Sequence, residues 1–132
     1  EALYPGSAPR VSGLGDANVT GHVVTVSVHK DSVLTHIPKY MIMYAVEEND
    51  ACRLHLTDGT SVAVDERIDE LRQLFEPYEE FARVNRSSIA NFKYVSAVMP
   101  ITLVMQDSRE LKIPFLRYRE YKWLKQEMDE LD

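Results

Sequence analysis

Residues 81 to 95 read Phe81-Ala82-Arg83-Val84-Asn85-Arg86-Ser87-Ser88-Ile89-Ala90-Asn91-Phe92-Lys93-Tyr94-Val95. Apolar anchors stand on either side of a polar interruption, residues 85–88, whose composition is typical of a turn with its side chains outward. The stretch is also basic, with Arg83, Arg86 and Lys93. An arginine held on such a turn is well placed to bind an anion or the edge of a nucleic-acid base.

The net charge of −6 is unevenly distributed along the 132 residues. Nucleic-acid-binding domains are usually basic on the face that meets phosphate, so the total by itself argues against such a partner. Between positions 83 and 125, however, nine basic residues stand against three acidic ones, a local balance of +6 that leaves −12 for the rest. The positive field therefore belongs to the half of the chain that carries the quoted stretch.

Outward from this stretch, runs of alternating apolar and β-branched residues predict short strands. The expected strands cover residues 22–28, 33–37, 40–46, 52–56, 61–64, 95–98, 102–105 and 111–115. The third of these is apolar enough to be buried on both faces. Asp58-Gly59 between two of the runs is a strong hairpin signal, and Pro114 places the last strand at an edge or a strand end.

Two helices are expected as well. Asp65 is positioned to cap the first, and Pro77 ends it. The second spans residues 117–131. The apolar side chains expected to face the core on these helices are Ile68, Leu71, Leu74 and Phe75 on the first and Tyr121, Leu124, Met128 and Leu131 on the second. The chain is thus predicted to be mostly β, with small antiparallel sheets, one short helix mid-chain and a C-terminal helix.

Length and composition allow one ordinary domain, which we place at residues 21–132. Residues 1–20 are rich in proline and glycine and are expected to be a linker or a disordered tail. A single cysteine, Cys52, cannot form an internal disulfide, which agrees with a reducing cytoplasm. No apolar run is long enough to span a bilayer, and the absence of an initial methionine suggests a fragment of a longer protein.

Catalysis and metal binding have little support in the sequence. The chain has no P-loop, no G-x-S-x-G and no dinucleotide fingerprint. His22, His29 and His36 are spaced by seven, which on extended chain alternates faces and gives no shared ligand side. The carboxylate pairs lie in polar segments, where a solvated surface explains them better than acid–base chemistry. We expect no enzyme activity, no metal and no cofactor.

The quoted stretch, from Arg83 onward, resembles the signature segment of the LytTR family of bacterial DNA-binding domains, whose common form reads R-V-H-R-S-Y-L-V-N-L-K-Y-I. Upstream, residues 53–60 and 68–71 are similar to the family's hairpin and short helix. Downstream, residues 111–117 resemble its closing I-P-V-S-R strand. The likeness spans residues 23–125, and it implies the family's compact arrangement of small antiparallel sheets.

The resemblance implies double-stranded DNA as the partner. In the family, side chains from several loops enter successive major grooves, and the base-reading positions fall here on Arg86 and Arg117. The planar fork of arginine suits such positions because it meets O6 and N7 of guanine in two hydrogen bonds. The alternative to base reading is that each of these arginines is solvated or forms a surface ion pair. The expected phosphate-binding or supporting residues are Asn85, Ser87, Arg83, Lys93, Arg119 and Lys122.

Several side chains have competing interpretations. Lys93 can instead lie along apolar neighbours, and Asn91 is interpreted as structural, bonding nearby backbone. Large apolar residues at strand or helix period are interpreted as core: Met41, Met43, Phe75, Phe81 and Trp123. The aromatic residues of the last helix have an alternative as a partner surface: Tyr118, Tyr121 and Trp123.

Three positions depart from the family pattern. Asn85 replaces the common histidine, and Leu116 replaces the serine before the closing arginine. The loop at residues 47–51, where the family has a third DNA-contacting loop, carries three acids that would repel phosphate unless the loop points away. These departures make weak binding, or dependence on a dimer, more plausible.

The sequence therefore predicts a sequence-specific DNA-binding output domain of a bacterial transcription regulator. By resemblance, a receiver domain of a two-component phosphorelay would precede it, and it would bind promoter direct repeats as a dimer. The competing class is a LytTR-like protein-interaction module that has lost DNA binding. A third class, a small-molecule-sensing β-domain, requires a sizeable internal pocket.

Overall fold

The computed structural model describes residues 23–130, and short strands dominate this part of the chain. The elements in chain order are β2 (Thr25–Lys30), β3 (Val33–Pro38), η1 (Lys39–Met41), β4 (Ile42–Glu48), β5 (Ala51–Leu56), β6 (Ser61–Val64), α1 (Ile68–Phe75), β7 (Phe81–Asn85), β8 (Ser88–Asn91), η2 (Phe92–Tyr94), β9 (Val95–Val98), β10 (Thr102–Met105), β11 (Glu110–Lys112), η3 (Phe115–Arg117) and α2 (Tyr118–Glu130). This order confirms the mostly-β prediction, with a short helix mid-chain and a second one at the C-terminal end.

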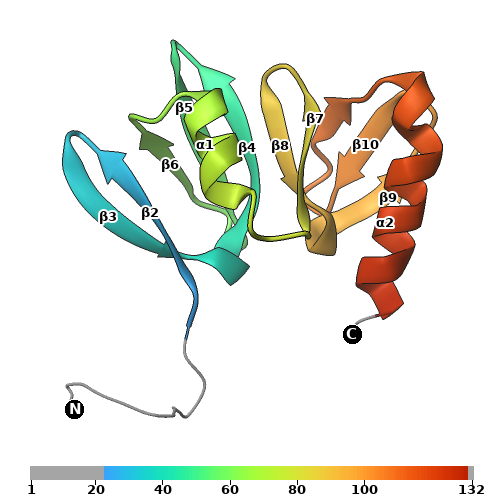
Figure 1. Cartoon of the computed structure of the whole chain (residues 1–132), viewed down its shortest axis with the longest axis horizontal. Coiled ribbons are helices and arrows are strands. Elements are labelled where there is room, and N and C mark those ends of the chain that lie inside the picture. The colour runs from blue at the N-terminus through green and yellow to red at the C-terminus, as the bar shows by residue number, and fades with distance from the viewer. Residues whose placement is uncertain (1–22, 131–132) are drawn as a thin grey trace.

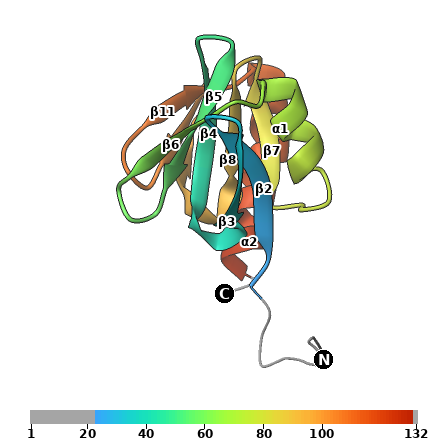
Figure 2. The same ribbon diagram turned by 90° about the vertical axis from the view of Figure 1, so that its left-hand side faces the viewer.

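The strands form three antiparallel sheets that follow one another across the molecule (Figure 1). β2 and β3 form a hairpin, β6-β5-β4-β8-β7 is a five-stranded sheet, and β11-β10-β9 is a three-stranded sheet. Figure 2 shows the hairpin in front of the five-stranded sheet. α1 packs against β4, β7 and β8, whereas α2 packs against η2 and β9. The five-stranded sheet is therefore covered on both faces.

Each face of the five-stranded sheet contributes to its own apolar cluster. One cluster joins the hairpin, the sheet and α1, and it includes the fully buried Leu54 and Leu71. The other joins the sheet, the three-stranded sheet and α2, and it includes Phe92 and Met128. Burying a large apolar side chain contributes about 1.5–3 kcal/mol. These two clusters therefore hold the hairpin, the five-stranded sheet and the three-stranded sheet together.

β4 is buried on both faces, as its apolar composition predicts. Met43 and Tyr44, which are successive residues of β4, nevertheless belong to the same cluster, the one that includes α2. Ile42 belongs to the other cluster, the one that includes α1. The pairing of β4 with β5 shifts register between Ile42 and Tyr44, which marks a β-bulge. Because a bulge inserts one extra residue, two successive side chains can point to one side of the sheet.

Turn chemistry fixes the hairpins locally. The predicted Asp58-Gly59 turn joins β5 to β6, with Gly59 at φ +87° and the Asp58 carboxylate accepting from the backbone N–H of Thr60 at 2.9 Å. Asp31 and Ser32 join β2 to β3, with φ of 51° and 68°. Positive φ at both central residues matches the twist of the flanking strands.

The predicted cap of the first helix was wrong. Asp65 is engaged elsewhere, because its carboxylate accepts from the backbone N–H of Ser32 at 2.7 Å and so fastens the β2–β3 turn. The helix begins after Arg67, whose backbone N–H is bonded by the Glu70 carboxylate at 2.8 Å. Leu74 was also misassigned, since it lies exposed beside the buried stripe of α1.

The C-terminal part differs from the prediction in two ways. The last strand ends at Lys112 rather than at residue 115, because Pro114 has no N–H for a strand ladder and a 3₁₀ turn follows it. Trp123 is exposed and was wrongly assigned to the core, since it lies two residues, about 200° of helix rotation, from the buried Tyr121. Tyr121 for its part is too buried to belong to a partner surface.

The other core assignments are confirmed for Met43, Phe75 and Phe81, whereas Met41 is only partly buried. The linker or tail predicted for residues 1–20, the first residue of the strand predicted at 22–28, and Leu131 lie outside the described residues.

Candidate nucleic-acid interface

The turn between β7 and β8 is stabilised by its own side chains. Asn85 ends β7, and its Oδ1 accepts from the backbone N–H of Ser87 at 2.9 Å and from the Ser87 hydroxyl at 3.3 Å. This is an Asx turn, in which a side chain replaces a backbone acceptor. Both residues predicted here as phosphate-binding or supporting are thus part of the turn's internal hydrogen bonding.

The Arg83 side chain also stabilises this turn. Its Nη1 lies 2.6 Å from Asp69 Oδ1 on α1, its Nη2 donates to the carbonyl of Arg86, and its Nε donates to the carbonyl of Asn85 at 3.3 Å. The side chain is 28% exposed. Arg83 therefore bonds the backbone that carries Arg86.

Arg86 occupies the tip of this turn, and its side chain is exposed. Within residues 23–130, no hydrogen bond, ion pair or ring contact engages its guanidinium. A guanidinium presents N–H donors in a fixed fork and has no acceptor. Arg86 therefore offers its full set of donors to solvent or to a ligand.

The side-chain amide nitrogen of Asn85 links the turn to the three-stranded sheet. Its Nδ2 donates to the backbone carbonyl of Lys112, at the end of β11, with a length of 2.8 Å. An open hollow at this junction is lined by Arg86 together with Arg109 and Lys112. Arg109 also lies over the Tyr44 ring, 5.9 Å from its centroid. The hydrogen bond thus brings three cations from two sheets to one place.

A second open hollow, of about 380 Å³, connects the same turn to the turn before α2. Arg86 and Arg117 both line it, together with Arg83, Pro114 and Tyr121. Arg117 makes an ion pair with Glu120, 3.2 Å from Nη1 to Oε1, in which both side chains are more than half exposed. The two predicted base-reading arginines therefore lie on one surface, around this hollow.

The remaining predicted contacts are more dispersed. Lys93 lies in η2, at the end of β8 opposite to Arg86, because Phe81 pairs with Asn91 at that end of the hairpin. Arg119 and Lys122 are exposed on the first turns of α2, and the Lys122 ammonium lies 5.6 Å from the Tyr118 ring centroid. Arg119 and Lys122 therefore follow Arg117 closely along the chain, whereas Lys93 lies apart from Arg86.

Asn91 is structural, as the sequence indicates. It is 1% exposed, its Nδ2 donates to the carbonyl of Ile42 at 3.0 Å, and its Oδ1 accepts from the backbone N–H of Lys93 at 3.0 Å. A buried amide with both ends bonded stabilises the junction of two strands.

The acidic turn between β4 and β5 lies beside the β7–β8 turn. The backbone N–H of Glu47 donates to the carbonyl of Ser87 at 2.8 Å, so the two turns are adjacent. Glu48 pairs with Arg53 at 3.0 Å, and this hydrogen bond and charge hold the pKa of the Glu48 carboxyl below its usual value. The loop does not point away from Arg86, so its negative charge affects whatever binds there.

Arg109 and Lys112 were missed as site residues, although both were counted in the basic half of the chain. Their signal in the sequence is weak, because cations that flank a short strand are ordinary on a surface. The packing of β11 against β7 and the Asn85–Lys112 hydrogen bond place them beside the β7–β8 turn.

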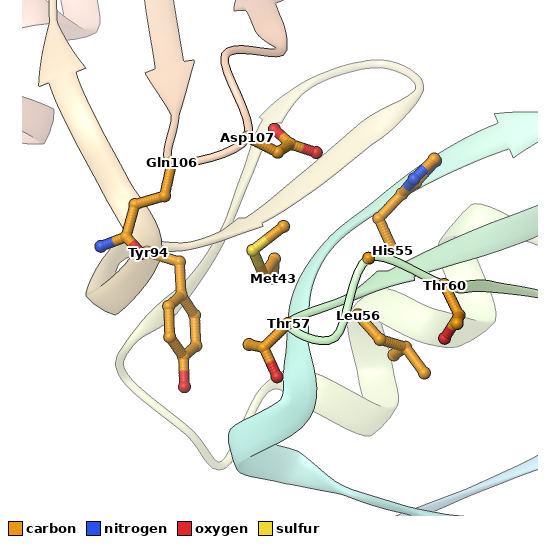
Figure 3. A pocket seen from close by; sticks show the side chains of 9 residues that line it. Met43, His55, Leu56, Thr57, Thr60, Tyr94, Gln106 and Asp107 are labelled. Carbon is orange, nitrogen blue, oxygen red and sulfur yellow. The ribbon is translucent and has the colours of Figure 1, made fainter.

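A third hollow, of about 350 Å³, opens between β4, the β5–β6 turn and the β10–β11 turn (Figure 3). The Asp107 and Thr60 side chains that line it are bonded within the protein: Asp107 accepts from the Tyr44 hydroxyl at 2.7 Å and from the Arg109 backbone N–H at 3.0 Å, and the Thr60 hydroxyl donates to Asp58 at 2.6 Å. A ligand pocket needs polar groups that converge on the ligand. This hollow therefore gives no support to a small-molecule sensor.

The comparisons with known proteins identify the family of the chain. A family model of LytTr DNA-binding domains matches residues 32–126. The chain belongs to the LytTR family of DNA-binding domains. A solved LytTr DNA-binding domain, of a protein described as a methyl-accepting/DNA response regulator from Bacillus cereus, is similar, with a TM-score of 0.58 and 16% identity over 79% of this chain and 97% of that one. At this identity the likeness shows the fold alone. A comparison with curated proteins finds no match.

Membership of the LytTR family implies DNA binding by a transcription regulator. It also confirms the prediction that the chain is not an enzyme, because the LytTR family is one of DNA-binding domains. The match begins at residue 32, so it includes β3 but not β2. No helix within residues 23–130 is long and apolar enough to cross a membrane.

Proposed function

We propose that this LytTR domain binds double-stranded DNA in a sequence-specific manner, with Arg86 and Arg117 reading bases in the major groove. The observation that supports this most is that both arginines line one hollow while Arg86 has no partner within the described residues. A bidentate arginine–guanine pair contributes about 1–3 kcal/mol of discrimination against the wrong base. Arg83, Asn85 and Ser87 hold the reading turn in place.

Arg109 and Lys112 add positive charge beside Arg86 in this proposal, and Arg119 and Lys122 add it beside Arg117. Such cations attract phosphate and release counterions without reading sequence. Lys93, at the other end of the β7–β8 hairpin, would meet DNA only if the duplex extends past that end. The N-terminal end of α2, beside Arg117, contributes a further partial positive charge.

We also propose the wider setting that the family suggests. The domain, residues 21–132, would be the cytoplasmic output part of a bacterial response regulator in a two-component phosphorelay. Residues 1–20 would link it to a receiver domain. The acidic β4–β5 turn beside the reading turn weakens a single contact, which favours binding of promoter direct repeats as a dimer.

A duplex selected from random sequences, titrated with the protein across salt concentrations, tests the proposal. If Arg109, Lys112, Arg119 and Lys122 each neutralise a phosphate, the slope of log K against log salt is roughly −3 to −4. Arg86→Ala is expected to weaken binding of the selected duplex by about 5- to 150-fold, with a smaller effect on random duplex. Lys30→Ala, which removes an exposed cation on the β2–β3 hairpin, serves as the control and should change little.

A second candidate function is a protein-interaction module that has lost DNA binding. It is favoured by the position of Glu47 and Glu48 next to the Arg86 turn. No binding of any duplex at low salt would establish it against the first proposal. Wild-type affinity in Arg86→Ala and Arg117→Ala would instead overturn the base-reading roles of the two arginines.

A further inference from the structure

The turn before α2 carries two large apolar side chains in the open. Leu116 is 94% exposed and Phe115 is 65% exposed. Single exposed apolar side chains are ordinary on protein surfaces. These two, however, are adjacent, and they directly precede Arg117, one of the two arginines of the proposed reading surface.

The backbone of this turn is held at both ends, so its side chains have a defined position. On one side, Ile113 is buried, its N–H donates to the carbonyl of Ile101 at 3.0 Å, and the carbonyl of the preceding Lys112 accepts from Asn85. On the other side, the N–H of Arg117 donates to the carbonyl of Pro114 at 3.0 Å, closing the 3₁₀ turn. An apolar side chain on such a turn reaches a partner with little ordering cost.

The charges around the turn favour DNA over an apolar protein surface as its partner. Arg117, Arg119 and Lys122 follow Leu116 closely along the chain, and Glu120 is the one acid among residues 115–122. Arg86 faces the same hollow as Arg117. An apolar protein partner would have to desolvate these cations, whereas a duplex supplies phosphates for them.

The major groove also contains one apolar group that an arginine cannot read. Thymine presents its C5 methyl there, and aliphatic side chains contact that methyl. A serine at position 116, as in the common family form, has no aliphatic surface for such a contact. Leu116 gives this chain an aliphatic side chain at that position.

We propose that Leu116, with Phe115 beside it, contacts a thymine methyl group next to the base that Arg117 reads. This inference rests on the proposed function and deepens it, because it predicts a thymine adjacent to a guanine in the bound sequence. Leu116 acts as a specificity-determining residue, and its contribution is confined to the methyl group.

Replacing each thymine of the selected duplex in turn by deoxyuridine removes only that methyl. The wild-type protein is expected to lose about fourfold in affinity at one or two positions, the effect of withdrawing one methyl from an apolar contact. Leu116→Ser should bind the thymine and deoxyuridine duplexes equally at those positions. Leu34→Ser, at an exposed leucine on β3, is the matched control and should keep the wild-type pattern.

Leu116→Ser changes an almost fully exposed side chain, so unchanged thermal unfolding is expected and separates recognition from folding. The inference is overturned if no thymine shows methyl dependence, or if Leu116→Ser retains it, while the selected duplex still binds. It is also overturned if Leu116→Ser reduces self-association in sedimentation and leaves the methyl dependence intact. Absence of binding to any duplex overturns the proposed function as well.

Discussion

Arg86 and Arg117 are chemically identical but differ in their surroundings. Arg86 has no partner within the described residues, whereas Arg117 is paired with Glu120 over 3.2 Å. Ion pairs between exposed side chains contribute about 0–1 kcal/mol, because water screens them and holding two long side chains costs entropy. A DNA phosphate or base can therefore replace Glu120 at little cost.

The charge of Glu120 itself should oppose binding. Glu120→Gln is expected to tighten binding of the selected duplex by about two- to fivefold at low salt, because it frees Arg117 and removes a repulsion from phosphate. The gain should shrink as salt rises, since the two charges are exposed. Dissociation constants at two salt concentrations measure this.

Glu127→Gln is the control, since it makes the same change two turns further along α2. If Glu120→Gln leaves the affinity unchanged or lowers it, Arg117 does not contact DNA from this position.

At the scale of secondary-structure elements, α1 and β11 position the turn of the β7–β8 hairpin. Arg83 links Asp69 on α1 to the carbonyls of Asn85 and Arg86 in the turn. Through it the short helix supports a turn that lies on a different element. Asn85 supplies the corresponding link to β11.

Arg83→Lys tests whether this support matters. Lysine keeps the charge but has no planar fork, so it cannot bond the three oxygens together. Hydrogen bonds to charged groups contribute about 1.5–3 kcal/mol each, and we expect Arg83→Lys to lower the free energy of unfolding by about 2 kcal/mol, measured in urea. Binding of the selected duplex should weaken more than binding of random duplex.

Asp69→Asn is the comparison variant. It removes only the ion pair, whose carboxylate is largely exposed, and should cost less stability than Arg83→Lys. Wild-type specificity in Arg83→Lys would mean that the turn keeps its shape without the guanidinium.

At the scale of the whole molecule, Tyr44 connects the five-stranded sheet to the three-stranded sheet. Its ring is buried in the five-stranded sheet, and its hydroxyl donates to Asp107 in the β10–β11 turn at 2.7 Å. Burial first, and then the nearby Asp107 carboxylate, raise the pKa of Tyr44 from 10.0 to about 12. The folded protein therefore holds this proton at a pH where the unfolded chain releases it.

The sign of the resulting pH dependence follows from that difference. A raised pKa gives stability that is complete below the unfolded pKa of 10.0 and is lost as pH rises toward 12. Burial also raises the pKa of the Cys52 thiol, to about 11, which adds a loss in an overlapping range. We expect the free energy of unfolding to fall by roughly 2 kcal/mol more between pH 9.5 and 11.5 in wild type than in Tyr44→Phe. Urea denaturation at these two values measures it, and equal losses in both proteins would contradict the assignment.

Local patterns in the sequence were sufficient for most elements of the fold. Alternation predicted the strands, Asp58-Gly59 predicted a hairpin, and the signature stretch predicted the family. These signals depend on residues close in the chain, where side-chain period and turn chemistry act directly. The errors at Asp65 and Trp123 occurred where a partner distant in sequence, or the choice of helix face, decided the outcome.

The sequence by itself determined that this protein has a basic half, with Arg83 and Arg86 in a LytTR signature segment and Arg117 in the segment that resembles the family's closing strand. Only the tertiary structure decided which of these guanidinium groups are available. Arg83 is bound to Asp69 and to the turn, whereas Arg86 is exposed in the hollow that Arg117 also lines. The physical reason is that availability depends on the oxygens within a few ångströms of each guanidinium, and those come from α1 and from the turn itself rather than from the pattern that made the arginines recognisable.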